Sequence, residues 1–178
     1  MKILVVYRSK TGNTRRYAEY IARELQADLQ ELGDVNPQKM AQYDVVCYGA
    51  GTYAASLGGL KNARAMFEKS GCGKLVLFAT GGCPNHMVED IEAVWHNMLP
   101  GDAYDQIPHF YMQAGINYEK MCAVDKTLMK MMVSHLKRKK NPTQQEAEAA
   151  RVMAASYDIV DFQYAKPLIQ LVKDLQNG

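Results

Sequence analysis

Short apolar runs alternate with segments of helical period over the first two thirds of the chain. The predicted strands span residues 2–7, 27–32, 43–49, 74–79 and 109–115. The runs at 2–7, 43–49 and 74–79 are almost unbroken, which is typical of parallel strands buried on both faces. The predicted helices span residues 14–27, 61–69 and 87–99. This alternation predicts β-α-β units and therefore a doubly wound α/β fold with a five-stranded parallel sheet.

The pattern changes after the last predicted strand. Further helices are predicted at residues 118–140, from Thr143 to about Ala155, and at 168–175. Thr143 and Glu146 have the spacing of a capping box, and Pro167 suits the first turn of the closing helix. The sequence therefore predicts one domain over residues 1–178, with a helical insertion at 116–156 between the last strand and the last helix.

Composition narrows the class of protein. The 178 residues are 48% hydrophobic and 22% charged, which is typical of one globular domain and excludes a disordered or fibrous chain. No apolar run approaches the roughly 20 residues that a membrane-spanning helix needs. The four cysteines are widely spaced, and the N-terminal sequence lacks the pattern of a signal peptide. We therefore expect a cytoplasmic protein with reduced thiols.

The loop after the first strand carries the strongest chemical signal. Four of its side chains are hydroxyl or amide donors: Ser9, Thr11, Asn13 and Thr14. Gly12 allows a close backbone approach, and the first N–H groups of the following helix add the positive end of its dipole. Together these groups predict a phosphate site. The alternative is a turn that only caps the helix, for which one such residue would suffice.

This loop contains neither the P-loop pattern nor G-x-G-x-x-G, which favours a monophosphate. The run from Val5 to Thr14, continued through Ala18 and Ile21, resembles the flavodoxin signature at every constrained position. The resemblance implies a flavodoxin-like fold and noncovalently bound FMN. It also implies that the FMN phosphate is held by Ser9, Lys10, Thr11, Gly12, Asn13 and Thr14.

The resemblance places the flavin ring beside two further loops. The implied ring-binding residues are Thr52, Tyr53 and Ala54 after one strand, and Thr80, Gly81 and Gly82 after the next. Tyr53 is available to stack on the ring, although an ordinary surface or core tyrosine explains it equally well. Many flavodoxins place an aromatic residue in the second loop, where this chain has Gly, Gly, Cys, Pro, Asn and His at 81–86. One flavin face is therefore expected to be open to a substrate or partner.

Cys83 and His86 have a second interpretation, as a nucleophilic pair or half of a metal site. Packing within the loop at 81–86, which we call the ring loop, explains Cys83 more simply. No second pair with zinc-like spacing occurs in the sequence, so we predict no metal site.

The net charge of +2 is a cancellation. Residues 75–119 contain six acids and no Lys or Arg, whereas residues 120–140 contain seven bases and one acid. In a flavodoxin-like fold the acidic segment is expected beside the flavin, where it would disfavour an anionic reduced cofactor or attract a basic partner. A solvated helix face explains the first three acids almost as well.

The basic segment, residues 120–140, is also amphipathic. It fits a helix packed on the domain with a solvated basic end, or a surface that contacts an anionic membrane or an apolar partner. Nucleic-acid binding is not expected, because no aromatic residues interleave with the bases. Residues 117–120 and 125–132 resemble the extra segment of flavodoxin-type, menaquinone-dependent protoporphyrinogen oxidases. That resemblance implies electron passage from a porphyrinogen towards a membrane quinone.

Two functions follow as hypotheses. The first is an FMN-binding electron-transfer protein with a redox partner protein. The alternative is an FMN-dependent oxidoreductase of the protoporphyrinogen-oxidase or quinone-reductase type, acting on a small organic substrate, with peripheral membrane or quinone contact through 120–140. A regulatory module without flavin is a third class, which uptake of FMN would exclude. The catalytic residues of an oxidoreductase are not evident in the sequence.

Overall fold

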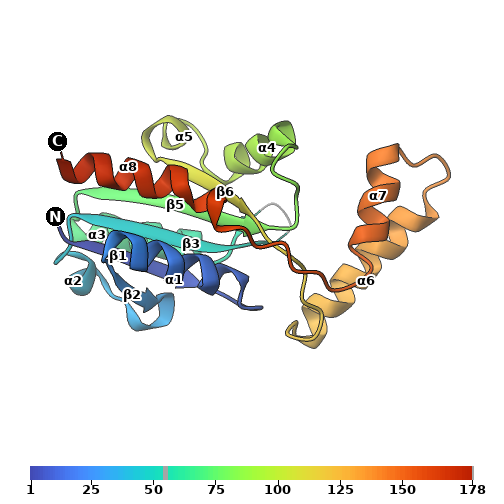
Figure 1. Ribbon diagram of the computed structural model, residues 1–178, viewed down its shortest axis with the longest axis horizontal. Coiled ribbons are helices and arrows are strands. Elements are labelled where there is room, and N and C mark those ends of the chain that lie inside the picture. The colour runs from blue at the N-terminus through green and yellow to red at the C-terminus, as the bar shows by residue number, and fades with distance from the viewer. Residues whose placement is uncertain (54–55, 178) are drawn as a thin grey trace. The chain divides into compact units, whose positions relative to one another are not determined.

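The chain forms two compact units in a computed structural model that describes residues 1–53 and 56–177. Residues Met1–Ala114 and Val160–Gly178 make up the first, which we call the sheet unit, and Gly115–Ile159 make up the second, the helical unit. Figure 1 labels helices and strands of both units along the chain.

Five parallel strands form the centre of the sheet unit, in the order β2-β1-β3-β5-β6. They span Ile3–Arg8 (β1), Asp28–Glu31 (β2), Val45–Tyr53 (β3), Lys74–Gly81 (β5) and His109–Gln113 (β6). This order confirms the predicted doubly wound α/β sheet. Two features were not predicted. β3 continues to Tyr53, and the short strand β4 (Ser56–Leu57) pairs with it in antiparallel fashion.

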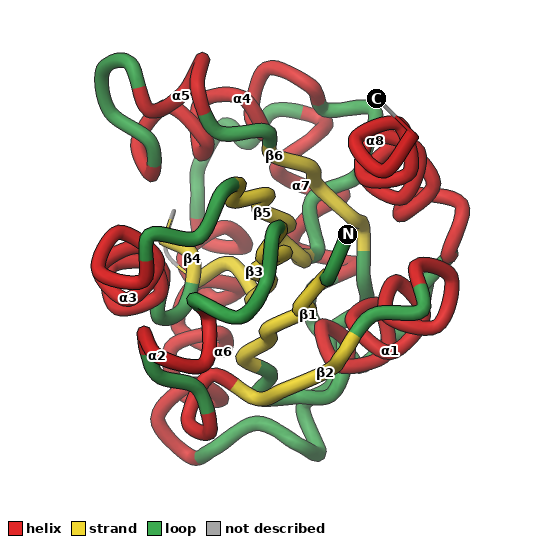
Figure 2. Tube along the Cα trace, turned by 90° about the vertical axis from the view of Figure 1, so that its left-hand side faces the viewer, coloured by secondary structure: helices red, strands yellow, loops and turns green. Residues whose placement is uncertain are grey.

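Helices cover both faces of this sheet, as Figure 2 shows end-on. The helices of the sheet unit are α1 (Asn13–Leu25), α2 (Pro37–Met40), α3 (Leu60–Ser70), α4 (Val88–Met98), α5 (Ala103–Gln106) and α8 (Lys166–Asn177), with short 3-10 turns at Leu32–Asp34 and Phe162–Ala165. Val5 faces α1 and α8, whereas Leu4 faces the side of α3 and α4. Successive residues of a strand point to opposite faces, so burial on both sides explains why β1 is an unbroken apolar run.

The segment that returns from the helical unit is fixed to the sheet by Tyr17 of α1. Its hydroxyl donates to the carbonyl of Gln113 at 2.6 Å and accepts from the N–H of Asp161 at 3.1 Å. Tyr17 is fully buried, and burial raises the pKa of its hydroxyl to about 12. One side chain therefore joins the end of β6 to the start of the segment that leads into α8.

The helical unit consists of α6 (Ala123–Arg138) and α7 (Gln144–Val152), with a bridge between Ile116 and Tyr157 near its ends. The capping box of Thr143 and Glu146 is present as predicted. The prediction that a helix starts at 118 was wrong, because Cys122 caps α6 by accepting from the N–H of Asp125. Among the described residues, no helix is both long and apolar enough to cross a bilayer.

Candidate functional site

The carboxyl ends of three parallel strands bring the predicted site residues to one edge of the sheet. Arg8 of β1 pairs with Ala50 of β3, and Gly51 pairs with Thr80 of β5. The segments that follow these strands therefore start side by side. Ala54 lies outside the described residues. Four predicted loop residues belong instead to strand ends: Thr52 and Tyr53 to β3, and Thr80 and Gly81 to β5.

The loop from Ser9 to Gly12 forms a closed turn before α1. Ser9 Oγ accepts a hydrogen bond from the N–H of Gly12 at 3.1 Å. Gly12 has a φ of 99°, a left-handed conformation that favours glycine, and it is the N-cap of α1. Because the N-cap residue is a glycine, no side chain caps the start of the helix, which is a position suited to an external anion. Asn13 and Thr14 are the first two residues of the helix, and Ser9 is bonded to its N-cap residue.

A buried hydrogen bond connects this loop to the third strand end. The hydroxyls of Thr14 and Thr80 lie 2.8 Å apart, with only 3% and 4% of the two residues exposed. Thr52 adds to the contact by donating to the carbonyl of Thr80 at 3.3 Å. The Thr14 hydroxyl therefore has a partner within the protein, and the main-chain N–H of Thr14 is a second group that it could offer a phosphate.

Tyr53 lies against the loop from Ser9 to Gly12, which we call the phosphate loop. The Nζ atom of Lys10 is 4.3 Å from the centroid of the Tyr53 ring, within the range of a cation–π contact. Tyr53 is partly exposed at the end of β3. This geometry is compatible with ring stacking, and the role of Tyr53 in cofactor binding stays a prediction.

The segment after β5 is held in place by residues that the sequence did not single out. Tyr111 donates to the carbonyl of Cys83 at 3.0 Å. Asn85 and Gln113 form a reciprocal pair, in which the N–H of each donates to the side-chain oxygen of the other, at 3.1 and 3.0 Å. The partners in each pair are 28 residues apart, so no short motif could have indicated them. The one indication in the sequence was that Cys83 and Asn85 follow one predicted strand while Tyr111 and Gln113 lie on the next.

The thiols of this region are poorly suited to nucleophilic chemistry. Burial, followed by the nearby charge of Asp90, raises the pKa of Cys83. Burial also raises the pKa of Cys47, inside β3, to about 12. A thiol with a raised pKa is protonated near neutral pH and is a weak nucleophile. The interpretation of Cys83 as packing within the ring loop is therefore favoured over a Cys83–His86 nucleophile.

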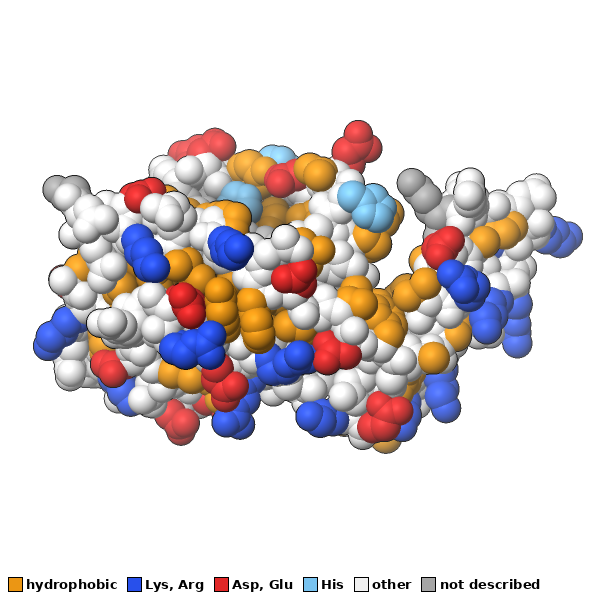
Figure 3. Space-filling model, viewed as in Figure 1, with side chains coloured by type: hydrophobic (Ala, Val, Ile, Leu, Met, Phe, Trp, Pro, Cys, Tyr) orange, Lys and Arg blue, Asp and Glu red, His pale blue; other side chains and the backbone are white. Residues whose placement is uncertain are grey.

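The acidic segment does not lie together beside the candidate site. Glu89 and Asp90 are in the first turn of α4, directly after the loop that follows β5. Asp102 and Asp105, in contrast, lie just before β6, at the opposite edge of the sheet, because α4 leads the chain back across it. The acidic side chains over α4 and α5 are visible in Figure 3. The expectation that the whole acidic segment flanks the flavin was wrong, and two acids near the ring loop remain.

The sheet order and the bonded strand ends define a doubly wound α/β protein, and the start of α1, which no side chain caps, lies where the strand order reverses. Residues 4–143 match the model of the family described as "Flavodoxin domain". The chain belongs to this family. FMN at this position of the sheet is the cofactor of flavodoxins, in agreement with the cofactor predicted from the sequence.

The similarity to an individual relative covers a shorter part of the chain than the family match does. An uncharacterized protein of Methanocaldococcus jannaschii is 31% identical over 90 residues, which are 47% of this chain and 57% of that protein. The match therefore spans less than two thirds of the relative's length.

Solved structures with similarity to the chain include a flavoprotein from Bacteroides eggerthii, 21% identical over 62% of this chain and 85% of that one, with a TM-score of 0.42. A flavodoxin from the domain Archaea is 17% identical over 96% and 99%, with a TM-score of 0.40. A Lactobacillus acidophilus flavoprotein in complex with FMN is 17% identical over 63% and 91%, with a TM-score of 0.42. Because these identities and TM-scores are low, the family assignment rests on the match of residues 4–143 to the family model.

Proposed function

We propose that the protein is a flavodoxin-like FMN protein that transfers electrons. The observation that carries this proposal is the geometry of the α1 start. Gly12 is the N-cap and supplies no capping side chain, and the Thr14–Thr80 bond fixes the helix start to the end of β5. Such a rigid, pre-formed anion site suits the phosphate of a cofactor that stays bound through repeated turnover.

The chain's own residues bind and orient the cofactor. Bound FMN would supply reversible uptake of electrons. The main-chain N–H groups at the start of α1 and the hydroxyls of Ser9 and Thr11 would hold its phosphate, while Thr52 and Tyr53 would lie on one side of the ring. Gly81 and Gly82 would present main-chain N–H groups to its polar edge. The pair of Asn85 and Gln113 would keep that segment in place.

Titration of the flavin-free protein with FMN and with riboflavin tests this proposal. We expect FMN to bind at micromolar concentration or tighter, with quenched flavin fluorescence and an absorbance band typical of flavin. Riboflavin lacks the phosphate, so it should bind at least about tenfold more weakly, as expected from the loss of charge-assisted hydrogen bonds. Equal affinity for the two flavins, or no binding of either, would contradict the proposal.

A second candidate is an FMN-dependent oxidoreductase of the protoporphyrinogen-oxidase or quinone-reductase type. The observation in its favour is the ring-side loop, which has no Phe, Tyr or Trp from Gly81 to His86 and so leaves a flavin face uncovered by that loop. The experiment replaces Gly115–Ile159 with a short linker and compares oxidation of the reduced protein by a soluble quinone. Unchanged quinone turnover in a variant that keeps its FMN would argue against a role of the helical unit in such an enzyme.

Gly81→Ala should lower the affinity for FMN by about tenfold, the equivalent of ~1.4 kcal/mol. A Cβ at this position would lie 2.4 Å from Thr52 Oγ1 and 2.7 Å from the Tyr111 hydroxyl, so these side chains or the strand end must shift. Isothermal titration of FMN measures the effect. Gly33→Ala is the matched control, because a Cβ there meets nothing within 4 Å. If both variants bind FMN as the unaltered protein does, the ring-side segment is not part of the site.

We also propose that α6 contacts an anionic bilayer, the location of a membrane quinone. Three apolar side chains with one-face spacing, Val124, Leu128 and Met131, are 67%, 58% and 63% exposed. We call them the apolar stripe. Basic residues on the same helix would favour an anionic surface.

The double variant Leu128→Glu with Met131→Glu should reduce binding to vesicles of phosphatidylcholine and phosphatidylglycerol at least about tenfold, because burial of each side chain is worth ~1.5–3 kcal/mol. Co-sedimentation measures the bound fraction. Val152→Glu, at a 38% exposed apolar residue of α7, serves as the control. Absence of vesicle binding by the unaltered protein would rule out this contact.

A further inference from the structure

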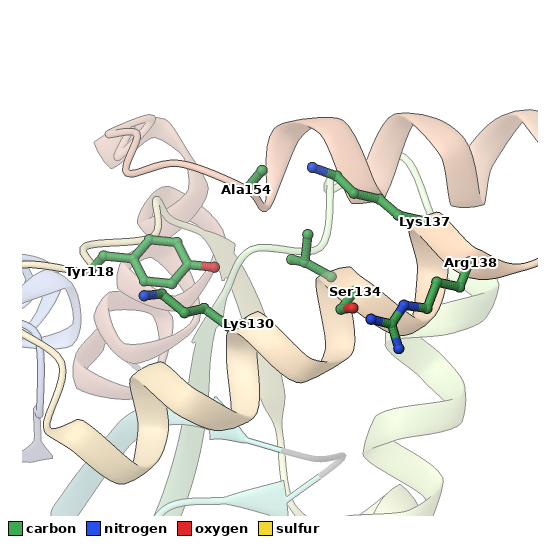
Figure 4. Close-up of a pocket in the computed structure, with 7 residues that line it drawn as sticks. Tyr118, Lys130, Ser134, Lys137, Arg138 and Ala154 are labelled. Carbon is green, nitrogen blue, oxygen red and sulfur yellow. The ribbon is translucent and has the colours of Figure 1, made fainter.

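The helical unit contains a pocket of about 320 Å³ whose lining is strongly basic. Figure 4 shows Lys130, Ser134, Lys137 and Arg138, which project from α6, together with Tyr118 and Ala154. The Nζ atom of Lys130 points towards Tyr118, and the guanidinium of Arg138 points towards Ser134 (Figure 4). The volume is at the lower end of the range for small-molecule sites.

Helical spacing gathers these cations on one face of α6. Ser134 follows Lys130 by four positions, and Lys137 and Arg138 follow Ser134 by three and four positions, so the four residues share a face. The apolar stripe is centred further around the helix, with its Met131 next to Arg138, seven positions later. In the sequence alone, the basic and apolar residues of this segment indicate one amphipathic surface. On the helix the basic residues are partly separated from the apolar stripe, and three of them line the pocket.

The three cations lack counter-charges within the described part of the chain. Lys130, Lys137 and Arg138 have no ion pair with a described residue, whereas their neighbour Lys139 pairs with Glu146 at 2.6 Å. Arg151 of α7 likewise pairs with Glu148, at 2.9 Å. The pocket itself is lined by no carboxylate among the described residues. The helix dipole favours Lys137 and Arg138 in the last turn, but it does not reach Lys130, and mutual repulsion of the three charges is left for an anion to relieve.

We propose that this pocket binds a small organic anion that carries two or more carboxylate or phosphate groups. Arg138 offers a planar fork for a carboxylate or phosphate group, and the lysines offer point charges. Ser134 adds a hydroxyl, while Val133 and the Tyr118 ring form an apolar surface for the carbon skeleton of the ligand. Tyr118 is fixed in this role, because it is buried and its hydroxyl donates to the carbonyl of Met153 at 2.7 Å.

This site is independent of the phosphate loop, which belongs to the sheet unit. The experiment therefore uses FMN-loaded protein, in which the loop is occupied. Isothermal titration at constant ionic strength compares citrate and pyrophosphate, as carboxylate and phosphate probes, with acetate as a singly charged reference. We expect at least one of the two multivalent anions to bind at least about tenfold more tightly than acetate. The stronger probe identifies the chemical source of the charge.

Two variants locate the binding. Lys137→Gln and Arg138→Gln should each weaken it at least about tenfold, the loss typical of a charged hydrogen bond. Lys140→Gln changes the net charge equally outside the pocket lining and should stay within about twofold. The proposal is overturned if citrate and pyrophosphate bind no better than acetate, or if all three variants weaken binding to the same extent. It is also overturned if the protein binds anionic vesicles or a polynucleotide but neither small anion.

Discussion

Gly12→Val should lower the affinity for FMN by about a hundredfold. The φ of 99° at Gly12 is strained for any residue with a Cβ and worst for a β-branched one, at a cost of ~1–3 kcal/mol. Relaxation of that strain moves the start of α1 and misaligns the N–H groups proposed to hold the phosphate, each worth ~1.5–3 kcal/mol with a charged partner. Their combined effect, about 3 kcal/mol, corresponds to about a hundredfold.

Two comparisons separate loss of the phosphate site from general strain. Riboflavin binding should change much less than FMN binding, because riboflavin has no phosphate. Gly71→Val introduces the same kind of strain, at a φ of 67° and with open space around its Cβ, in the turn that follows α3. It should lower thermal stability and leave FMN affinity unchanged. A similar loss of FMN affinity in both variants would mean that Gly12 has no special role in the site.

Gly49→Ala should destabilise the fold by about 3 kcal/mol, at the upper end of the usual cost of overpacking. A Cβ at Gly49 would lie 1.9 Å from Cζ of Phe78. The Phe78 ring is fully buried, and the two residues are register partners in the central strands β3 and β5. In a chain of this length the loss corresponds to a fall in Tm of about 6–12 °C, which calorimetry on the flavin-free protein can measure.

Phe78→Leu combined with Gly49→Ala provides the internal check. The smaller side chain vacates the space that the new methyl group needs, so the double variant should be more stable than the sum of the single effects predicts. Purely additive losses would show that the Gly49–Phe78 contact is not the source of the destabilisation.

The elements with a local cause are predictable from the sequence. β1 is buried on both faces and therefore has an unbroken apolar run, and the capping box at Thr143 is set by two residues three positions apart. A glycine at position 12, between a strand and a helix, indicates a special backbone conformation by its residue type alone. Each of these signals depends on neighbours within one element, which is the range that hydrophobic period and capping chemistry describe.

Contacts between distant elements are not predictable in the same way. The Thr14–Thr80 bond joins residues that are 66 positions apart, and no pattern in the sequence links the two threonines to each other. The predicted start of α6 is too early because apolar spacing continues through the turn before Cys122. Opposite sheet edges separate Asp105 from Glu89 although the sequence places them in one acidic segment. Position in three dimensions, which sequence proximity does not give, decides the Thr14–Thr80 bond and the separation of the two acids, whereas the start of α6 depends on the local cap by Cys122.

The sheet unit is made of two chain segments, and this has a consequence for synthesis on the ribosome. The first 114 residues emerge with all five parallel strands, but α8, whose Leu168 and Val172 are fully buried in the core beside α1, comes after the whole helical unit. Until then, one apolar face of the sheet is only partly covered. A nascent chain that stalls within Gly115–Ile159 would therefore expose an apolar sheet surface that favours aggregation. This apolar face is fully covered only after α8 has been synthesised.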